Sequence, residues 1–166
     1  CRLLDEAMQQ LKTGKPVEVV PDPLIELQVE AYLDNDYIGD AMHKIEIYQR
    51  IAAVQNNQQL EEIAGELVDR FGKPPQPVKN LLTVARIRNY ARDMGVEKIL
   101  QAPLFLEIHF RATPHIRPEG MVELSGWLKS YLKVIQDRNL IRISVKALAK
   151  QRVQDFVLRL VQTLAG

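Results

Sequence analysis

The stretch that decides the fold runs from Glu61 to Met94 and reads EEIAGELVDRFGKPPQPVKNLLTVARIRNYARDM. Apolar residues recur in its first half at spacings of three and four, which is the period of one face of an α-helix. Gly72 follows where a helix C-terminus favours a left-handed residue, and the prolines after it stop the helix from continuing. The helical period then resumes from Val78 to Tyr90. The sequence therefore predicts two amphipathic helices, joined by a short stiff turn and packed on a shared core.

The first of these helices carries an acidic stripe away from its apolar side. Glu62, Glu66 and Asp69 occur at positions i, i+4 and i+7, which places them on one face. The helix macrodipole favours cations near a C-terminus, so Asp69 does not serve helix stability, although Arg70 can offset part of the charge. Two interpretations stay open from the residues alone: a solvated helix face, or a docking face for a basic partner.

Sequence motifs before and within the hairpin follow a known family pattern. In order, they are Tyr37-Ile38, Lys44, Tyr48, Ile51-Ala52, Asp69-Arg70-Phe71-Gly72, Pro75, Pro77 and Val78-x-Asn80-Leu81-Leu82. Over about residues 24–95 the chain resembles the C-terminal domain of the bacterial transcription-repair coupling factors (Mfd). The second half, residues 103–166, resembles the family in layout more than in motif.

The resemblance implies a function for the parent protein and a role for this part of it. The parent would be a cytoplasmic DNA translocase that uses ATP and Mg. It would displace stalled RNA polymerase and recruit the excision-repair protein UvrA. The C-terminal domain would fold back on a UvrB-like module near the N-terminus and mask the surface that UvrA binds. Glu66 and Asp69 match the family's motif helix and would face basic residues of that module, with Glu62 extending the patch.

Composition bounds the class of protein. The 166 residues are 46% hydrophobic and 26% charged, with a formal net charge of +1, which provides no global basic field for a polyanion. No run of 18 or more apolar residues occurs, so no membrane span is expected. Cys1 is the single cysteine, which excludes an intramolecular disulfide and fits a reducing compartment. The chain lacks an initiator Met and opens inside a predicted helix, which indicates a fragment of a longer polypeptide.

The remaining segments predict an α+β fold: a helical hairpin subassembly packed with a small, mainly antiparallel sheet. We expect one regulatory domain over residues 1–166, with the end of a linker helix at 1–16, a helical half at 24–95 and a sheet-and-helix half at 96–166. In the helical half, period-two alternation predicts a strand from Ile25 to Tyr32, and Asp40 caps a helix whose predicted inward residues are Met42, Ile45, Tyr48, Ile51 and Ala52. In the second half, the expected elements are strands 96–100 and 104–111, a helix at 119–130, a hairpin at 131–146 with its turn at 137–139, and a helix at 152–164.

No set of residues predicts a catalytic or cofactor site. The sequence has no Gly-rich phosphate loop and no GxSxG elbow, and Cys1 at the terminus is a poor nucleophile. The Asp34-Asn35-Asp36 turn lacks the rest of a calcium loop. Glu107, His109 and His115 could converge on a metal, but a partly exposed surface is the preferred interpretation. We therefore expect this fragment to be non-enzymatic, with no metal and no cofactor of its own.

The second helix of the hairpin offers an alternative role in DNA contact. Arg86, Arg88 and Arg92 form a basic run around Tyr90, a combination that can bind phosphate backbones. Asp93 interrupts the run, and the near-neutral chain adds little long-range attraction. Pairing with carboxylates of the same domain is the preferred interpretation for these arginines, and an auxiliary DNA-contact module is the alternative function.

Overall fold

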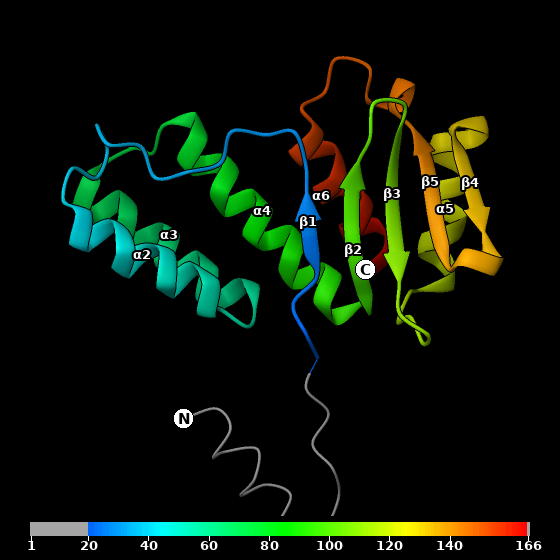
Figure 1. Ribbon diagram of the computed structural model, residues 1–166, viewed down its shortest axis with the longest axis horizontal. Coiled ribbons are helices and arrows are strands. Elements are labelled where there is room, and N and C mark those ends of the chain that lie inside the picture. The colour runs from blue at the N-terminus through cyan, green and yellow to red at the C-terminus, as the bar shows by residue number, and fades with distance from the viewer. Residues whose placement is uncertain (1–19, 166) are drawn as a thin grey trace, which may run out of the picture.

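The predicted helical hairpin is present in the computed structural model, which describes residues 20–165 (Figure 1). Its two helices are α3, Asn57–Phe71, and α4, Gln76–Asp93. Gly72 ends α3 with a φ of +83°, a conformation in which a Cβ would be strained. Pro75 precedes the first residue of α4, and Pro77 lies in its first turn, where no intrahelical amide is required. The stop between the two helices is therefore confirmed.

The other elements confirm an α+β fold. The remaining α-helices are α2 (Ala41–Ala53), α5 (Pro118–Leu128) and α6 (Val153–Ala165). The strands are β1 (Leu24–Glu26), β2 (Val96–Gln101), β3 (Phe105–Phe110), β4 (Leu132–Ile135) and β5 (Leu140–Ser144). Three short 3-10 helices lie at Lys129–Tyr131, Gln136–Arg138 and Val145–Leu148. The sheet order is β1-β2-β3-β5-β4, in which β1 pairs parallel with β2 and every other pairing is antiparallel.

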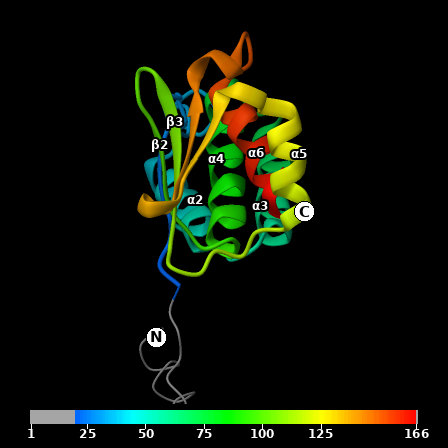
Figure 2. The same ribbon diagram turned by 90° about the vertical axis from the view of Figure 1, so that its right-hand side faces the viewer.

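The core consists of two hydrophobic clusters that share α4. The sheet cluster lies between one face of the sheet and the helices α4, α5 and α6, as the turned view in Figure 2 shows. The helix cluster lies where α2, α3 and the first half of α4 meet. Helix α4 contributes Val78 and Ala85 to the helix cluster, and Ile87 and Ala91 to the sheet cluster. It is therefore the one described helix with buried residues in both clusters.

The predicted strand from Ile25 to Tyr32 is mostly wrong, because only Leu24–Glu26 is a strand. Its partner β2 pairs Glu26 with Leu100 and ends one residue later, so the following backbone has no strand to extend along. The chain bends there, and the Tyr32 amide instead donates to the carbonyl of Pro77 at 3.2 Å. From Ile25 to Tyr32 the side chains still alternate between partly buried and exposed, but beyond Glu26 the backbone is not part of the sheet.

The predicted inward face of α2 is also partly wrong. Ile47 and Ile51 are the buried residues of this helix, whereas Met42, Ile45, Tyr48 and Ala52 are exposed. Apolar residues stand on both sides of α2, since Ile45 and Ile47 are about 200° apart around a helix. Periodicity alone could not select the side that meets Leu60 and Leu67 of the helix cluster. Asp40 caps the helix as predicted, since its carboxylate accepts from the amides of Met42 and His43.

The second half follows the sequence prediction with shifted ends. Leu104 lies outside β3 and is exposed, while Leu106, Ile108 and Phe110 point into the sheet cluster. The helix predicted at the start of the chain and the linker at 1–16 lie outside the described residues. Between residues 20 and 165, none of the helices combines the length and hydropathy that a membrane span requires.

Candidate functional site

The acidic stripe predicted on the hairpin lies on the solvent side of α3. Leu60, Ile63 and Leu67 of this helix are buried in the helix cluster, which directs Glu62 and Asp69 outward. Asn56 starts the helix, since its side-chain oxygen accepts from the Gln59 amide at 2.9 Å. Because α3 is packed along one side and capped at both ends, it presents these carboxylates from a rigid support.

Glu66, at the centre of the stripe, is neutralised within the chain. Arg50 of α2 donates two hydrogen bonds to its carboxylate, one of them 3.1 Å long, and Arg70 donates a third at 3.1 Å. The hydrogen bonds from Arg50, and then from Arg70, hold the pKa of Glu66 below its ordinary value. The side chain of Glu66 therefore joins α2 to α3 as well as lying in the stripe.

Glu62 and Asp69 supply the unneutralised charge of this surface. Neither carboxylate forms an ion pair within residues 20–165, and both residues are exposed. A shallow groove of about 280 Å³ lies between α2 and α3, and Arg50, Val54 and Glu62 are among the residues that line it. We name the outward surface of Glu62, Glu66 and Asp69 the acidic face.

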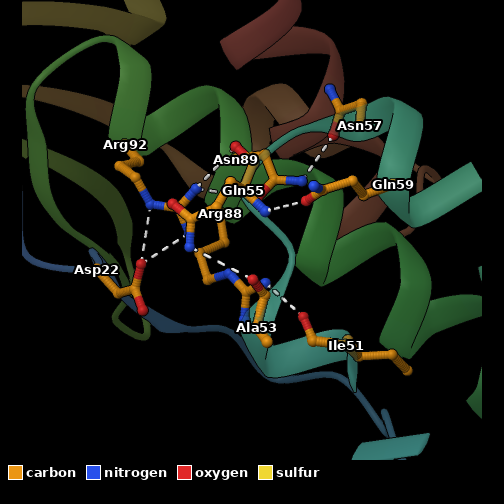
Figure 3. Close-up of polar contacts among 9 residues, drawn as sticks. All are labelled: Asp22, Ile51, Ala53, Gln55, Asn57, Gln59, Arg88, Asn89 and Arg92. Carbon is orange, nitrogen blue, oxygen red and sulfur yellow. Dashed lines mark hydrogen bonds and ion pairs between the residues drawn. The ribbon is translucent and has the colours of Figure 1, made fainter. Parts of the chain in front are cut away.

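Arg88 and Arg92, predicted as possible DNA contacts, point instead toward the connection between α2 and α3 (Figure 3). Arg88 donates to the carbonyl of Ile51 at 2.7 Å, and burial lowers the pKa of this guanidinium. Arg92 is buried, and it donates to the Gln55 carbonyl at 3.2 Å and to Asp22 at 2.9 Å. These contacts fasten the C-terminal end of α2 to α4, and Asp22 adds the incoming chain to the same network.

Two further side-chain contacts join α4 to α3. Arg86 forms an ion pair with Glu61 of α3, and the Asn89 amide donates to Asn57 at 3.0 Å. All three arginines of the predicted basic run therefore have partners in the chain. Their present geometry serves the packing of α4 against α2 and α3.

Sequence reasoning missed Arg50 and Asp22, which are central to these contacts. Arg50 is 16 residues from Glu66, and Asp22 is 70 residues from Arg92. Arg70 was found because a spacing of four on a helix predicts contact. The longer-range pairs leave no comparable signal in one sequence.

In the second half, Glu107 of β3 contacts His109 on the same strand and Arg142 on β5. Glu107 accepts from Arg142 at 2.8 Å and lies 3.2 Å from the His109 ring nitrogen. Burial raises the pKa of Glu107, but the hydrogen bonds from Arg142 and His109 outweigh that effect and lower it overall. Within residues 20–165, no three His, Cys, Asp or Glu side chains gather closely enough to hold a metal ion.

Comparison with known proteins places this fold in a family. The transcription-repair-coupling factor of Escherichia coli K12 is 32% identical over 126 residues, covering 74% of this chain, and that of Haemophilus influenzae is 34% identical over the same share. The Staphylococcus aureus USA300 factor is 30% identical over 147 residues, or 87% of this chain. The chain spans only 11% to 13% of the length of these relatives.

A solved structure agrees with the sequence relatives. The crystal structure of a C-terminal domain of transcription-repair coupling factor has a TM-score of 0.70 to this chain at 25% identity, and it covers 86% of this chain and 89% of its own. The TRCF domain model matches residues 27–121, which include the hairpin with its acidic face. The chain therefore belongs to the TRCF domain family.

Proposed function

We propose that this chain is the regulatory, non-catalytic C-terminal domain of a transcription-repair coupling factor. The parent would be a cytoplasmic, ATP- and Mg-dependent DNA translocase that releases stalled RNA polymerase and recruits UvrA. In the free parent, this domain would dock on the UvrB-like N-terminal module and mask the UvrA-binding surface. The domain itself would need no cofactor, and it would meet DNA through the parent.

The observation that carries this proposal is the acidic face. Glu62 and Asp69 are exposed, lie on one rigid helix and have no ion-pair partner among the described residues. A partner with exposed arginines or lysines would complete these charges. Glu66 belongs to the same face, but its two arginines reduce the charge that it offers to a partner.

The energetics suit a contact that opens on demand. Interfaces between domains of one chain are usually modest in size and polar, so they release without unfolding either side. Tethering gives an effective concentration that can reach about the millimolar range, which keeps even a weak contact mostly closed. An activating partner then needs a differential affinity of only a few kcal/mol to shift the population toward the open form.

The test is a charge reversal in the full-length parent. Glu62→Lys with Asp69→Lys should raise its affinity for UvrA about tenfold or more, because repulsion replaces attraction at the masked interface. Surface plasmon resonance measures the affinity, and circular dichroism of the isolated domain checks that it stays folded. Glu66 is left unchanged, because its reversal would also break the contacts with Arg50 and Arg70.

The matched control is Glu97→Lys with Glu123→Lys, which makes the same change of charge at exposed residues outside the hairpin. UvrA affinity should stay at the wild-type value in this control. An unchanged affinity in the Glu62 and Asp69 variant would overturn the masking role.

The alternative DNA-contact role requires Arg86, Arg88 and Arg92 to leave their present partners. It predicts a salt-sensitive gel shift that is lost when these arginines are replaced.

A further inference from the structure

The two halves of the described chain carry opposite charge. Residues 20–95 contain twelve Asp or Glu and eight Lys or Arg, whereas residues 96–165 contain six Asp or Glu and eleven Lys or Arg. Helices α2 and α3 lie at one end of the longest axis of the molecule, and β4 and β5 lie at the other end (Figure 1). The near-neutral net charge of the chain therefore combines an acidic helical half with a basic sheet half.

Most of the positive excess comes from residues 129–152, which run from the end of α5 to the start of α6. This stretch contains seven Lys or Arg and one acidic residue, Asp137. Arg142 pairs with Glu107 on the neighbouring strand. The other six basic residues are exposed and form no ion pair within the described part of the chain, so their charge is available to a partner.

The fold brings five of these six cations to one end of the sheet. In the antiparallel pair of β4 and β5, Leu132 lies opposite Ile143, so the residues just before β4 and just after β5 lie at the same end. The segment after β5 is held to the sheet, because the Val145 amide donates to the Leu104 carbonyl at 3.0 Å. We name this group of five residues the basic end: Lys129, Lys133, Lys146, Lys150 and Arg152.

The composition of the basic end favours the backbone of a DNA duplex as its partner. Four of its five members are lysines, which are hydrated point charges and are depleted in interfaces between proteins. Tyr131 is the single aromatic residue of the 129–152 stretch, so there is no row of rings on which the bases of a single strand could stack. Lysine contacts to the phosphates of a duplex need neither an apolar centre nor stacking.

We infer that the basic end binds the phosphate backbone of duplex DNA. Neighbouring strands lie about 4.8 Å apart, so about 19 Å of sheet separates β4 from β1. Helices α2 and α3 lie on the far side of β1 (Figure 1). The acidic face is thus too distant to cancel the basic end, because the Debye length at physiological salt is only about 8 Å. The inference goes beyond the proposed function, since it gives the domain a DNA contact of its own, at residues other than the arginines of α4.

The test is DNA binding by this chain with and without two of the lysines. Fluorescence anisotropy of a short labelled duplex measures the affinity over a series of salt concentrations. Five phosphate contacts predict a slope of about −4.5 in log affinity against log salt. Lys146→Gln with Lys150→Gln should reduce the slope to about −2.7 and lower the affinity at low salt about tenfold, because two phosphate contacts are lost. Circular dichroism checks that the variant stays folded.

The matched control is Lys73→Gln with Lys79→Gln, the same change of charge at exposed lysines of the helical half. It should bind the duplex with the affinity and slope of the wild type. The inference is overturned if the wild type does not bind, if the Lys146 and Lys150 variant binds like the wild type, or if both variants lose affinity equally. It is also overturned if polyglutamate competes as well as unlabelled duplex at equal charge concentration, because the partner would then be an acidic protein.

Discussion

At the residue scale, two glycines within helices differ in the space around them. Gly65 faces open space, whereas Gly120 faces the backbone of a neighbouring helix. A Cβ built on Gly65 of α3 would meet nothing within 4 Å. A Cβ on Gly120 of α5 would lie 2.4 Å from the carbonyl oxygen of Thr163 and 3.0 Å from the Cα of Leu164. Gly120 is therefore required for the close approach of α5 to α6. No packing contact requires a glycine at position 65, where it lowers the stability of the helix.

This difference predicts opposite effects of the same substitution. Gly65→Ala should raise the free energy of unfolding by about 0.5–1 kcal/mol, because alanine loses less backbone entropy in a helix. Gly120→Ala should lower it by about 1–3 kcal/mol, because backbone atoms of α6 must move. Urea unfolding of the isolated domain measures both. A destabilising Gly65→Ala would show that the surface of α3 is less open than described.

At the scale of single elements, the centre of the sheet is joined by a charged contact as well as by its backbone. Glu107 on β3 stands directly opposite Arg142 on β5 and accepts its hydrogen bond. Arg142 also lies over the ring of Phe105, with 5.1 Å between the guanidinium carbon and the ring centre. The pair is only partly exposed, so the charged form of Glu107 is held by specific contacts.

The contact predicts a pH-dependent contribution to stability. The folded-state pKa of Glu107 is lowered from its ordinary value of 4.5, so the folded state favours the carboxylate more than the unfolded state does. Its contribution is complete above pH 4.5 and is lost as the pH falls through the lower folded-state value. The wild-type advantage over Glu107→Gln should therefore be present at pH 7 and shrink below pH 4.5. Urea unfolding at stepped pH measures it, and a difference independent of pH would contradict the assignment.

At the scale of the whole molecule, α4 connects two hydrophobic clusters, and more elements pack around one of them than around the other. The sheet cluster is enclosed by the sheet and the helices α4, α5 and α6, whereas the helix cluster depends on α2, α3 and half of α4. Arg88 and Arg92 fasten the end of α2 to α4 across the junction (Figure 3). A hollow of about 180 Å³ lies there between β1, α2 and α4, lined in part by Ile25, Ile51 and Arg88. The acidic face therefore sits on the less supported part of the domain.

This arrangement predicts that α2 opens before the sheet does. In native-state hydrogen exchange, amides of α2 should exchange at a lower opening free energy than those of β3. Arg92→Met should lower the α2 value further, by about 1–3 kcal/mol, because the Gln55 carbonyl and the Asp22 carboxylate lose the hydrogen bonds that the guanidinium donates. Amides of β3 should change less. Equal changes in both elements would show that the domain opens as one unit.

The sequence by itself determined the hairpin, the ends of its helices, the cap on α2 and the class of the fold. These features depend on residues within one or two turns of each other, and spacing along the chain reports such contacts directly. Residues 24–95 also carried the family resemblance, and the family is confirmed. The acidic face was predicted as three like charges on one side of a helix, and two of them are exposed without an ion-pair partner in the described part of the chain.

Only the tertiary structure decided which side of α2 is buried, where β1 ends and which charges are neutralised. Ile45 and Ile47 are equally apolar, and the position of Leu60 and Leu67 makes Ile47 the buried one. Arg50 and Glu66 meet because two helices pack side by side, across 16 residues of sequence. Burial and long-range pairing are properties of neighbours in space, and a single sequence records only neighbours along the chain.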